Sequence, residues 1–183
     1  SGSYTVQSGD SSSDLTVSSI ALSAGTLSDA AGNAMSSFSI GTNLADSKAL
    51  IIDGTAPTIT SVSSSTADGS YKAGDAIALT VNFSEAVTLS GGTLVVTLET
   101  GSTDRTVTLS SISGAASASG SYTVESGDSS SDLTVSSIAL SAGTLADAAG
   151  NAMSSFSIAT NLADSKDLVI DATAPTITSV SSS

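Results

Sequence analysis

The chain of 183 residues contains no cysteine, no histidine and no tryptophan, and only two prolines. Without cysteine, no disulfide can hold the fold together. Without histidine and cysteine there is no Ser-His-Asp or Cys-His pair for nucleophilic catalysis and no imidazole ligand for zinc. A carboxylate pair for glycoside hydrolysis is the catalytic arrangement left open, but aromatic residues are only 3% of the chain, so platforms for a sugar are scarce. We therefore expect no enzymatic activity.

Basic residues are also scarce. Four Lys and Arg stand against 17 Asp and Glu, which gives a formal net charge of −13. Binding to nucleic acid or to an anionic membrane surface needs a basic face, so neither partner is expected. No apolar run approaches the roughly 18–20 residues that span a bilayer, so membrane insertion is not expected. An acidic surface instead favours cations or cationic partners.

The sequence contains a long internal repeat. Residues 1–65 match residues 119–183 without a gap, and because Tyr4 corresponds to Tyr122 the period is 118 residues. This period is the size of a whole domain rather than of a solenoid coil. The two copies differ only at Gln7/Glu125, Ser28/Ala146, Gly41/Ala159, Ala49/Asp167, Ile51/Val169 and Gly54/Ala172.

Both prolines lie in a six-residue stretch that occurs twice, as DGTAPT in residues 53–58 and as DATAPT in residues 171–176. We call these stretches the first and the second joint. Each follows one apolar run and precedes another, which is typical of a strand end, a stiffened connection and a new strand. The joints predict three parts: residues 1–53 as the C-terminal half of a preceding repeat, 54–171 as a complete repeat, and 172–183 as the first strand of the next.

The complete repeat has the pattern of an all-β domain. Apolar residues alternate with small or polar ones in short runs bounded by Gly, Ser and Asp, which predicts antiparallel strands with one buried face. Seven strands in a domain of this length predict a seven-stranded antiparallel immunoglobulin-like β-sandwich in tandem array. In residues 145–153, Gly150-Asn151 favours a loop over a helix. The predicted strands are residues 58–62, 76–83, 93–99, 105–109, 119–124, 133–140 and 167–170.

Several of these segments, taken in order, resemble bacterial immunoglobulin-like repeats. They are ADGSYKAGD (67–75), VNFSEAV (81–87), LETG (98–101), YTVESGD (122–128), DAAGN (147–151) and the D-x-T-A-P joint. Such repeats occur in giant cell-surface proteins, including the cyanobacterial SwmB-type repeats and the extender regions of RTX and biofilm-associated adhesins. The resemblance covers essentially the whole repeat. It implies an extracellular, non-enzymatic extender domain at the cell surface, often rigidified by Ca²⁺, although the glycine-rich nonapeptide of RTX modules is absent.

Sandwich topology sorts the acidic loops between the two ends of the predicted domain. One end collects Asp53 from the first joint, Glu85 from the loop after strand 76–83, and Asp147 and Asn151 from the loop before the last strand. Three carboxylates and an amide with no base nearby in sequence are ligands suited to Ca²⁺. The sequence therefore predicts a calcium site here. The alternative interpretation is an Asx-type turn at residues 147–151 and a solvated strand end at Glu85.

Further residues extend this prediction. Asp29 and Asn33 are the equivalent loop pair in the first copy, and Asp171 of the second joint is expected to meet the acids at the opposite end of the domain. At that end basic residues lie among the acids, so ordinary solvated turns are the favoured interpretation and metal ligation is the weaker one. The weaker candidate ligands there are Asp75, Asp104, Asp128 and Asp132.

Two classes of function, structural and binding, and two forms of assembly remain open. A spacer repeat that gives length and calcium-dependent rigidity is the leading interpretation, because near-identical tandem copies suit a structural role. A carbohydrate- or partner-binding module is the alternative, although aromatic and Arg anchors are few. The repeats are expected to contact their neighbours in the same chain, either as one extended arm or, with other copies, as a fibre or surface layer. An open half-domain at residues 1–53 exposes edges that a donor strand or another chain could complete.

Overall fold

The computed structural model describes residues 2–182, and the chain divides into two units, residues 1–55 and residues 56–183. The division falls inside the first joint. It does not test the three-part arrangement of repeats, which stays a prediction. Among the described residues the secondary structure is β-strand with one short 3-10 turn, so the chain is all-β. No helix there is long and apolar enough to cross a bilayer.

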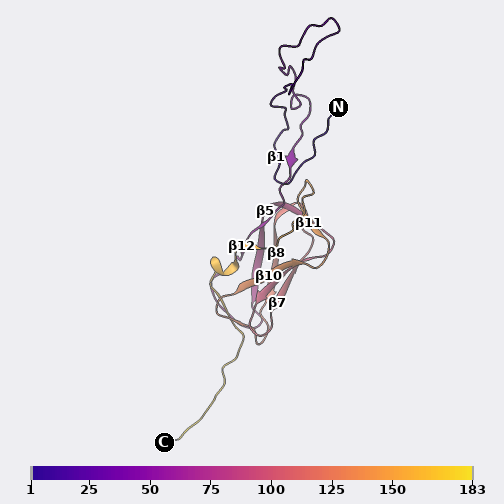
Figure 1. Ribbon diagram of the computed structural model, residues 1–183. Helices are drawn as coiled ribbons and strands as arrows, with labels where there is room; N and C mark the ends of the chain where they lie inside the picture. The colour runs from indigo at the N-terminus through magenta and orange to yellow at the C-terminus, as the bar shows by residue number, and fades with distance from the viewer. Residues whose placement is uncertain (1, 183) are drawn as a thin grey trace. The chain divides into compact units, whose positions relative to one another are not determined.

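The second unit contains nearly all of the strands (Figure 1). Its short 3-10 turn, η1 (Leu162–Asp164), is closed by a capping box between Asn161 and Asp164. The strands are β3 (Ile59–Ser63), β4 (Gly69–Tyr71), β5 (Ala76–Ser90), β6 (Leu94–Glu99), β7 (Arg105–Leu109), β8 (Ala115–Thr123), β9 (Ser129–Ser130), β10 (Thr134–Leu140), β11 (Thr144–Ala146), β12 (Ile158–Thr160) and β13 (Leu168–Asp171).

Three sheets organise these strands. In the largest, β5 pairs with β3, β8 and β11, and β12 joins the free side of β3. The second sheet has the order β10-β6-β7, and the third has the order β4-β13-β9. Most pairs are antiparallel, but β12 lies parallel to β3 and β13 lies parallel to β4.

One apolar core joins the sheets. Side chains alternate between buried and accessible along β5 and β6, as the period of a strand requires. Leu79 and Val81 of β5 and Leu94, Val96 and Leu98 of β6 are at most 2% exposed and belong to the same cluster of buried side chains. The buried core residues of the described chain lie between positions 59 and 170, so the core belongs to the second unit.

A glycine allows β8 to pack closely against side chains of β7. A Cβ atom built on Gly120 would lie 2.6 Å from both Leu109 Cδ2 and Val107 Cγ1. A side chain at position 120 would therefore displace two core residues. The corresponding residue of the first copy, Gly2, has nothing within 4 Å of the same position.

The seven predicted strands are present, with changed bounds. The largest change concerns β5, which continues to Ser90 although the sequence predicts a loop after Phe83. Glu85 therefore lies within a strand, beside a register shift between Asn82 and Val87. The strand continues because β11 supplies new partners for residues 88–90. Residues 145–153 contain no helix, as expected, and they form a turn closed by a bridge between Ala146 and Ala152.

The first unit and the C-terminal residues form few strands. Residues 2–55 contain β1 (Ser11–Ser12), β2 (Ile52–Asp53) and an isolated bridge between Ser28 and Ala34. Residues 172–182 contain no strand, and their assignment to the start of a next repeat stays a prediction. The physical reason is the same in both cases. In the second unit, the segments equivalent to the unpaired ones form ladders with strands contributed by residues 56–118, a segment that the sequence contains once.

Candidate metal site at the first joint

The loop before Met153 is held by its own polar groups. Oδ1 of Asp147 accepts hydrogen bonds from the backbone N–H groups of Gly150 (2.7 Å) and Asn151 (2.8 Å), and Oδ2 accepts from the Asn151 side chain (2.7 Å). Burial raises the pKa of Asp147, but these donors stabilise its charged form and the net pKa lies below its ordinary value. The carboxylate is therefore ionised at neutral pH, although it is only 7% exposed.

The start of the second unit is fastened next to Glu85. The Ser84 N–H donates to the carbonyl of Thr58 at 2.9 Å, and the Thr58 N–H donates to Oγ of Ser84 at 3.0 Å. This pair of bonds ties the last residue of the first joint to β5, one residue before Glu85. Pro57 is buried next to this pair of bonds, and its ring fixes the φ angle of the backbone there.

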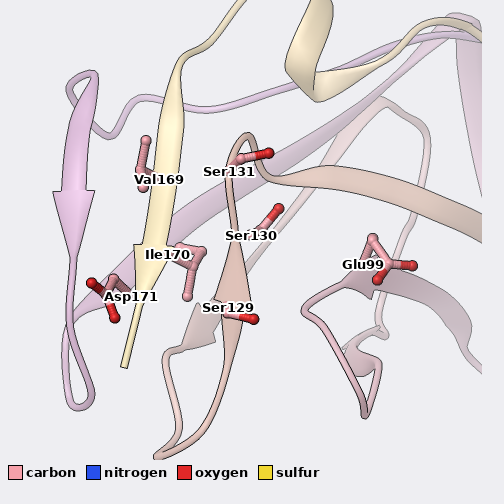
Figure 2. A pocket seen from close by; sticks show the side chains of 7 residues that line it. All are labelled: Glu99, Ser129, Ser130, Ser131, Val169, Ile170 and Asp171. Atoms are coloured by element: carbon pink, nitrogen blue, oxygen red, sulfur yellow. The ribbon is translucent and has the colours of Figure 1, made fainter. Parts of the chain in front are cut away.

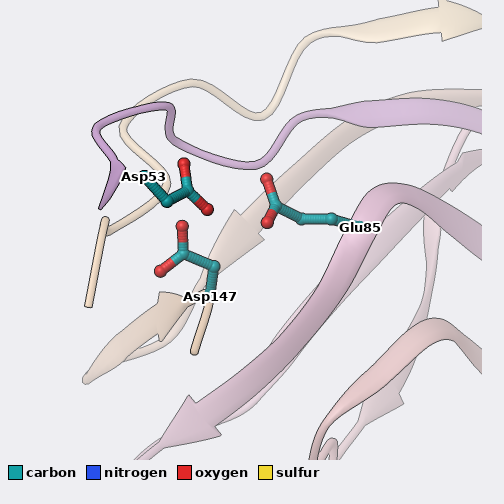
Figure 3. A group of neighbouring side chains, drawn as sticks. All are labelled: Asp53, Glu85 and Asp147. Atoms are coloured by element: carbon teal, nitrogen blue, oxygen red, sulfur yellow. The ribbon is translucent and has the colours of Figure 1, made fainter. Parts of the chain in front are cut away.

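Asp53, Glu85 and Asp147 form the one group of three acidic residues among positions 2–182 whose carboxylate oxygens all lie within 4.8 Å of one another. Figure 3 shows the three carboxylates turned toward a common space. Asp53 is the first residue of the joint, and its Oδ1 accepts from the Thr55 N–H at 3.0 Å. Asp147 is buried, and Asp53 and Glu85 are half-buried.

The spacing of these oxygens suits a calcium ion. Ca²⁺ binds oxygen at about 2.3–2.6 Å, so one ion reaches two oxygens up to roughly 5 Å apart. Without a cation, each ionised pair at this range repels by roughly 3–4 kcal/mol at an effective dielectric constant near 20. Asn151, the fourth predicted ligand, donates its side-chain N–H to Asp147 and so positions that carboxylate.

The equivalent loop of the first copy has the same local bonds. Oδ1 of Asp29 accepts from the N–H groups of Ala31 and Asn33, both at 2.9 Å, and Oδ2 accepts from the Asn33 side chain at 2.9 Å. The loop conformation is thus encoded within its own residues, as an Asx-type turn would be. The first unit has no residue equivalent to Glu85, because the repeat there covers only the sequence of residues 119–171.

Asp171 lies away from this group. It ends β13, is exposed, and its Oδ1 accepts from the Thr173 N–H at 3.2 Å. Asp171 and Glu99 line an open pocket together with Ser129 and Ser130, and Figure 2 shows the two serines on the strand between the two acids. The pocket thus gathers two carboxylates and several hydroxyl groups. It contains no third carboxylate within the distance that defines the group at the first joint.

The weaker candidate ligands have protein partners or stand apart. Asp75 accepts from the backbone N–H of Lys72 (2.9 Å) and from its ammonium group (3.1 Å). Asp104 is exposed, and Oδ1 of Asp132 is buried without a hydrogen-bond donor. None of the four weaker candidates belongs to a three-acid group among the described residues.

The sequence interpretation missed the polar centre around Asp128, which is 2% exposed. Its Oδ1 accepts from Arg105 Nε at 2.9 Å, and its Oδ2 accepts from the Tyr122 hydroxyl at 2.6 Å and from the Glu125 N–H at 2.9 Å. Arg105 also pairs with Glu125 at 2.8 Å. The position of Arg105 directly after Asp104, among the acids of that end, was the available signal. Both Asp128 oxygens have strong donors, so we do not include Asp128 in the candidate cation site.

Comparison with protein-family models, with curated proteins and with solved structures gives no match to this chain.

Proposed function

We propose that the chain is a structural, non-enzymatic repeat of an extracellular bacterial surface protein or filament, and that Ca²⁺ at the first joint makes consecutive repeats rigid. The carboxylate group of Asp53, Glu85 and Asp147 is the observation that carries this proposal. The period of 118 residues and the near-identity of the copies support a spacer role, because a spacer gains length from repetition without needing a distinct site in each copy.

The proposal includes the immunoglobulin-like form of the domain. Support comes from the antiparallel pairing of β5 with β3 and β8, the separate β10-β6-β7 sheet, and the single core to which both contribute. An immunoglobulin-like sandwich has its strand connections at two ends. Asp53 of the joint, Glu85 of β5 and Asp147 of the connection after β11 would then meet at one end.

In the proposed mechanism, Ca²⁺ controls the flexibility of the first joint. Without a cation, repulsion among three carboxylates favours separation of Asp53 from the second unit. A bound Ca²⁺ reverses this preference, because its charge and its demand for several oxygen ligands hold Asp53 to Glu85 and Asp147. Pro57 and the Thr58–Ser84 bonds already fix one side of the joint. Holding Asp53 would restrict the other side.

The test compares the full chain in millimolar Ca²⁺ and in EDTA, by thermal unfolding and by small-angle scattering. Ca²⁺ at about 100 times its dissociation constant should stabilise the unit that binds it by about 2.7 kcal/mol. It should also narrow the distribution of end-to-end distances. Identical melting curves and scattering profiles in the two conditions would contradict the proposal.

The repeat offers a matched control for this test. The Glu85→Gln and Asp147→Asn variants should each lose the response to Ca²⁺. The Asp29→Asn variant changes the same loop in the first copy, where no equivalent of Glu85 exists, and should keep the full response. A response abolished equally by all three variants would indicate non-specific screening of acidic charge.

A further inference from the structure

The same apolar residues are exposed in the first copy and buried in the second. Tyr4 is 57% exposed and Tyr122 is 3% exposed, while Leu27 is 50% exposed and Leu145 is fully buried. A row of large apolar side chains at the surface marks an interaction site more often than an ordinary surface. Five more residues of the first unit are exposed while their equivalents are buried: Val6, Val17, Ile20, Met35 and Leu50. Leu22 and Ile51 are also exposed, and their equivalents Leu140 and Val169 are half-buried.

The second copy identifies what covers this row. Tyr122 pairs with Ile77 in the β5–β8 ladder, and Val135 and Ile138 of β10 pair with β6. The covering strands β3 to β7 all lie in residues 56–118, a segment that occurs once in the chain. We infer that residues 2–53 are an acceptor surface for a second segment with the sequence of residues 56–118, joined directly ahead of residue 1.

Glycine 2 supports this occupant. In the second copy, Gly120 has no side chain at the point where Val107 and Leu109 of β7 pack closest. The equivalent position 2 is also a glycine, although nothing lies within 4 Å of where its Cβ would be. A segment equivalent to β7 would explain why a side chain is excluded at this position, since a Cβ there would overlap two of its apolar residues.

The polar centre gives a second, independent match. Asp128 accepts from Tyr122, Glu125 and Arg105. In the first copy, Asp10 accepts from the Tyr4 hydroxyl and, at 2.7 Å, from the Gln7 N–H. Arg105 belongs to residues 56–118, so the added segment would bring an arginine to Asp10.

Continuity of one strand favours attachment ahead of residue 1 over a separate chain. Strand β8 runs from Ala115 to Thr123 without interruption. Its first four residues belong to the covering segment and its last five, 119–123, correspond to residues 1–5 of the first copy. A segment joined at residue 1 extends this strand, whereas a separate chain would break it and would also lose the advantage of high effective concentration.

The experiment adds residues 56–118 directly ahead of the full chain, and compares the fusion with the chain alone. The fusion should show an unfolding enthalpy about twice that of the chain alone, because a second domain of equal size now folds. It should also bind less of an apolar dye such as ANS, and slow amide exchange should extend into residues 4–50. An unchanged enthalpy with unchanged dye binding would overturn the inference.

Two controls make the result specific. Gly2→Val should lower the melting temperature of the fusion and leave the chain alone unchanged. In the added segment, a Leu→Asp substitution at the position equivalent to Leu98 should abolish the gain in unfolding enthalpy. Leu98 itself is fully buried in its own repeat. Association of a separate 56–118 polypeptide in trans that equals the fusion in stability would contradict the preference for attachment.

This inference does not depend on Ca²⁺. Its measurements are made in EDTA, so failure of the proposed metal function would leave the enthalpy and exchange results unaffected. Conversely, a fusion that fails to gain a second folded domain would leave the response of Glu85 and Asp147 to Ca²⁺ intact.

Discussion

Residues 1–53 and residues 119–171 have nearly the same sequence but different environments. The side chains equivalent to core residues are exposed in the first copy and buried in the second. Their local polar bonds are nevertheless alike. Asn43 exchanges hydrogen bonds with the backbone of Val17 at 2.9 and 2.8 Å, and Asn161 does the same with Val135 at 3.0 and 2.9 Å.

This comparison separates what a segment encodes by itself from what it receives from its neighbours. Asx turns and the Asn43 and Asn161 contacts are made within one copy, so both copies have them. Burial and pairing with β4, β5 and β6 require residues 56–118, so only the second copy has them, whereas the pairing of β9 with β13 recurs in the first copy as β1 with β2. The C-terminal residues show the same dependence on neighbouring strands. Ile177 is 88% exposed, whereas its equivalent in β3, Ile59, is 2% exposed.

The largest expected difference between the copies comes from a core truncation. Leu145→Ala should destabilise the second unit by about 2–5 kcal/mol, since it removes a fully buried side chain and leaves a cavity. Leu27→Ala changes the equivalent residue, which is 50% exposed, and should cost less than about 0.5 kcal/mol. Urea unfolding of the two variants measures both values, and equal losses would break the comparison.

A glycine pair should give the next largest difference. Gly120→Val places side-chain atoms against Val107 and Leu109, and overpacking of this kind costs about 1–3 kcal/mol. Gly2→Val meets no neighbour within 4 Å and should be neutral. The difference in thermal melting temperature between the two variants provides the measurement. A destabilising Gly2→Val would mean that the first copy is already covered in solution.

The smallest difference is expected from acid. Burial raises the pKa of Asp128, but bonds from Tyr122, Glu125 and Arg105 outweigh burial and leave the net pKa below its ordinary value. A carboxylate with a lowered folded-state pKa stabilises the fold above its unfolded pKa of about 3.9, and this stability is lost as the pH falls through the folded-state pKa. In the Asp128→Asn variant, the free energy of unfolding should therefore depend less on pH below about pH 4.

The control for the acid prediction is Asp10→Asn. Asp10 has the equivalent tyrosine partner but lies in the first copy, which contributes nothing to the buried core. Its substitution should leave the acid unfolding of the second unit unchanged. Equal flattening by both variants, measured by unfolding at pH 2 to 6, would assign the effect to general loss of negative charge.

The sequence was sufficient to predict an all-β chain and the positions of the seven main strands, because alternation along β5, β6 and β7 reflects a buried face directly. It did not predict the end of β5. The run Ser84-Glu85-Ala86 breaks the alternation, and the strand continues because β8 pairs with Val87 and β11 pairs with residues 88–90. The short strands β4, β9 and β12 were missed for the same reason, since their pairing partners, not their own residues, define them.

The candidate site was predictable in part. Asp53, Glu85 and Asp147 were grouped from the expected topology, and their oxygens lie within 4.8 Å of one another. Whether they bind a cation stays a prediction. The role of Arg105 was not predictable in detail, because its partners Asp128 and Glu125 lie about 20 residues along the chain and no pattern within one strand links them to it.

The central claim is that the strands of residues 56–118 are what makes the second copy buried and the first copy exposed. Native-state hydrogen exchange on residues 1–183 is the most direct test of this claim. Each amide of residues 119–171 then has an internal reference 118 positions earlier. The account predicts that amides in β8, β10 and β13 exchange only through global unfolding, while their equivalents in residues 2–53 exchange through local opening at near-zero cost. Equal protection of the two copies would contradict it.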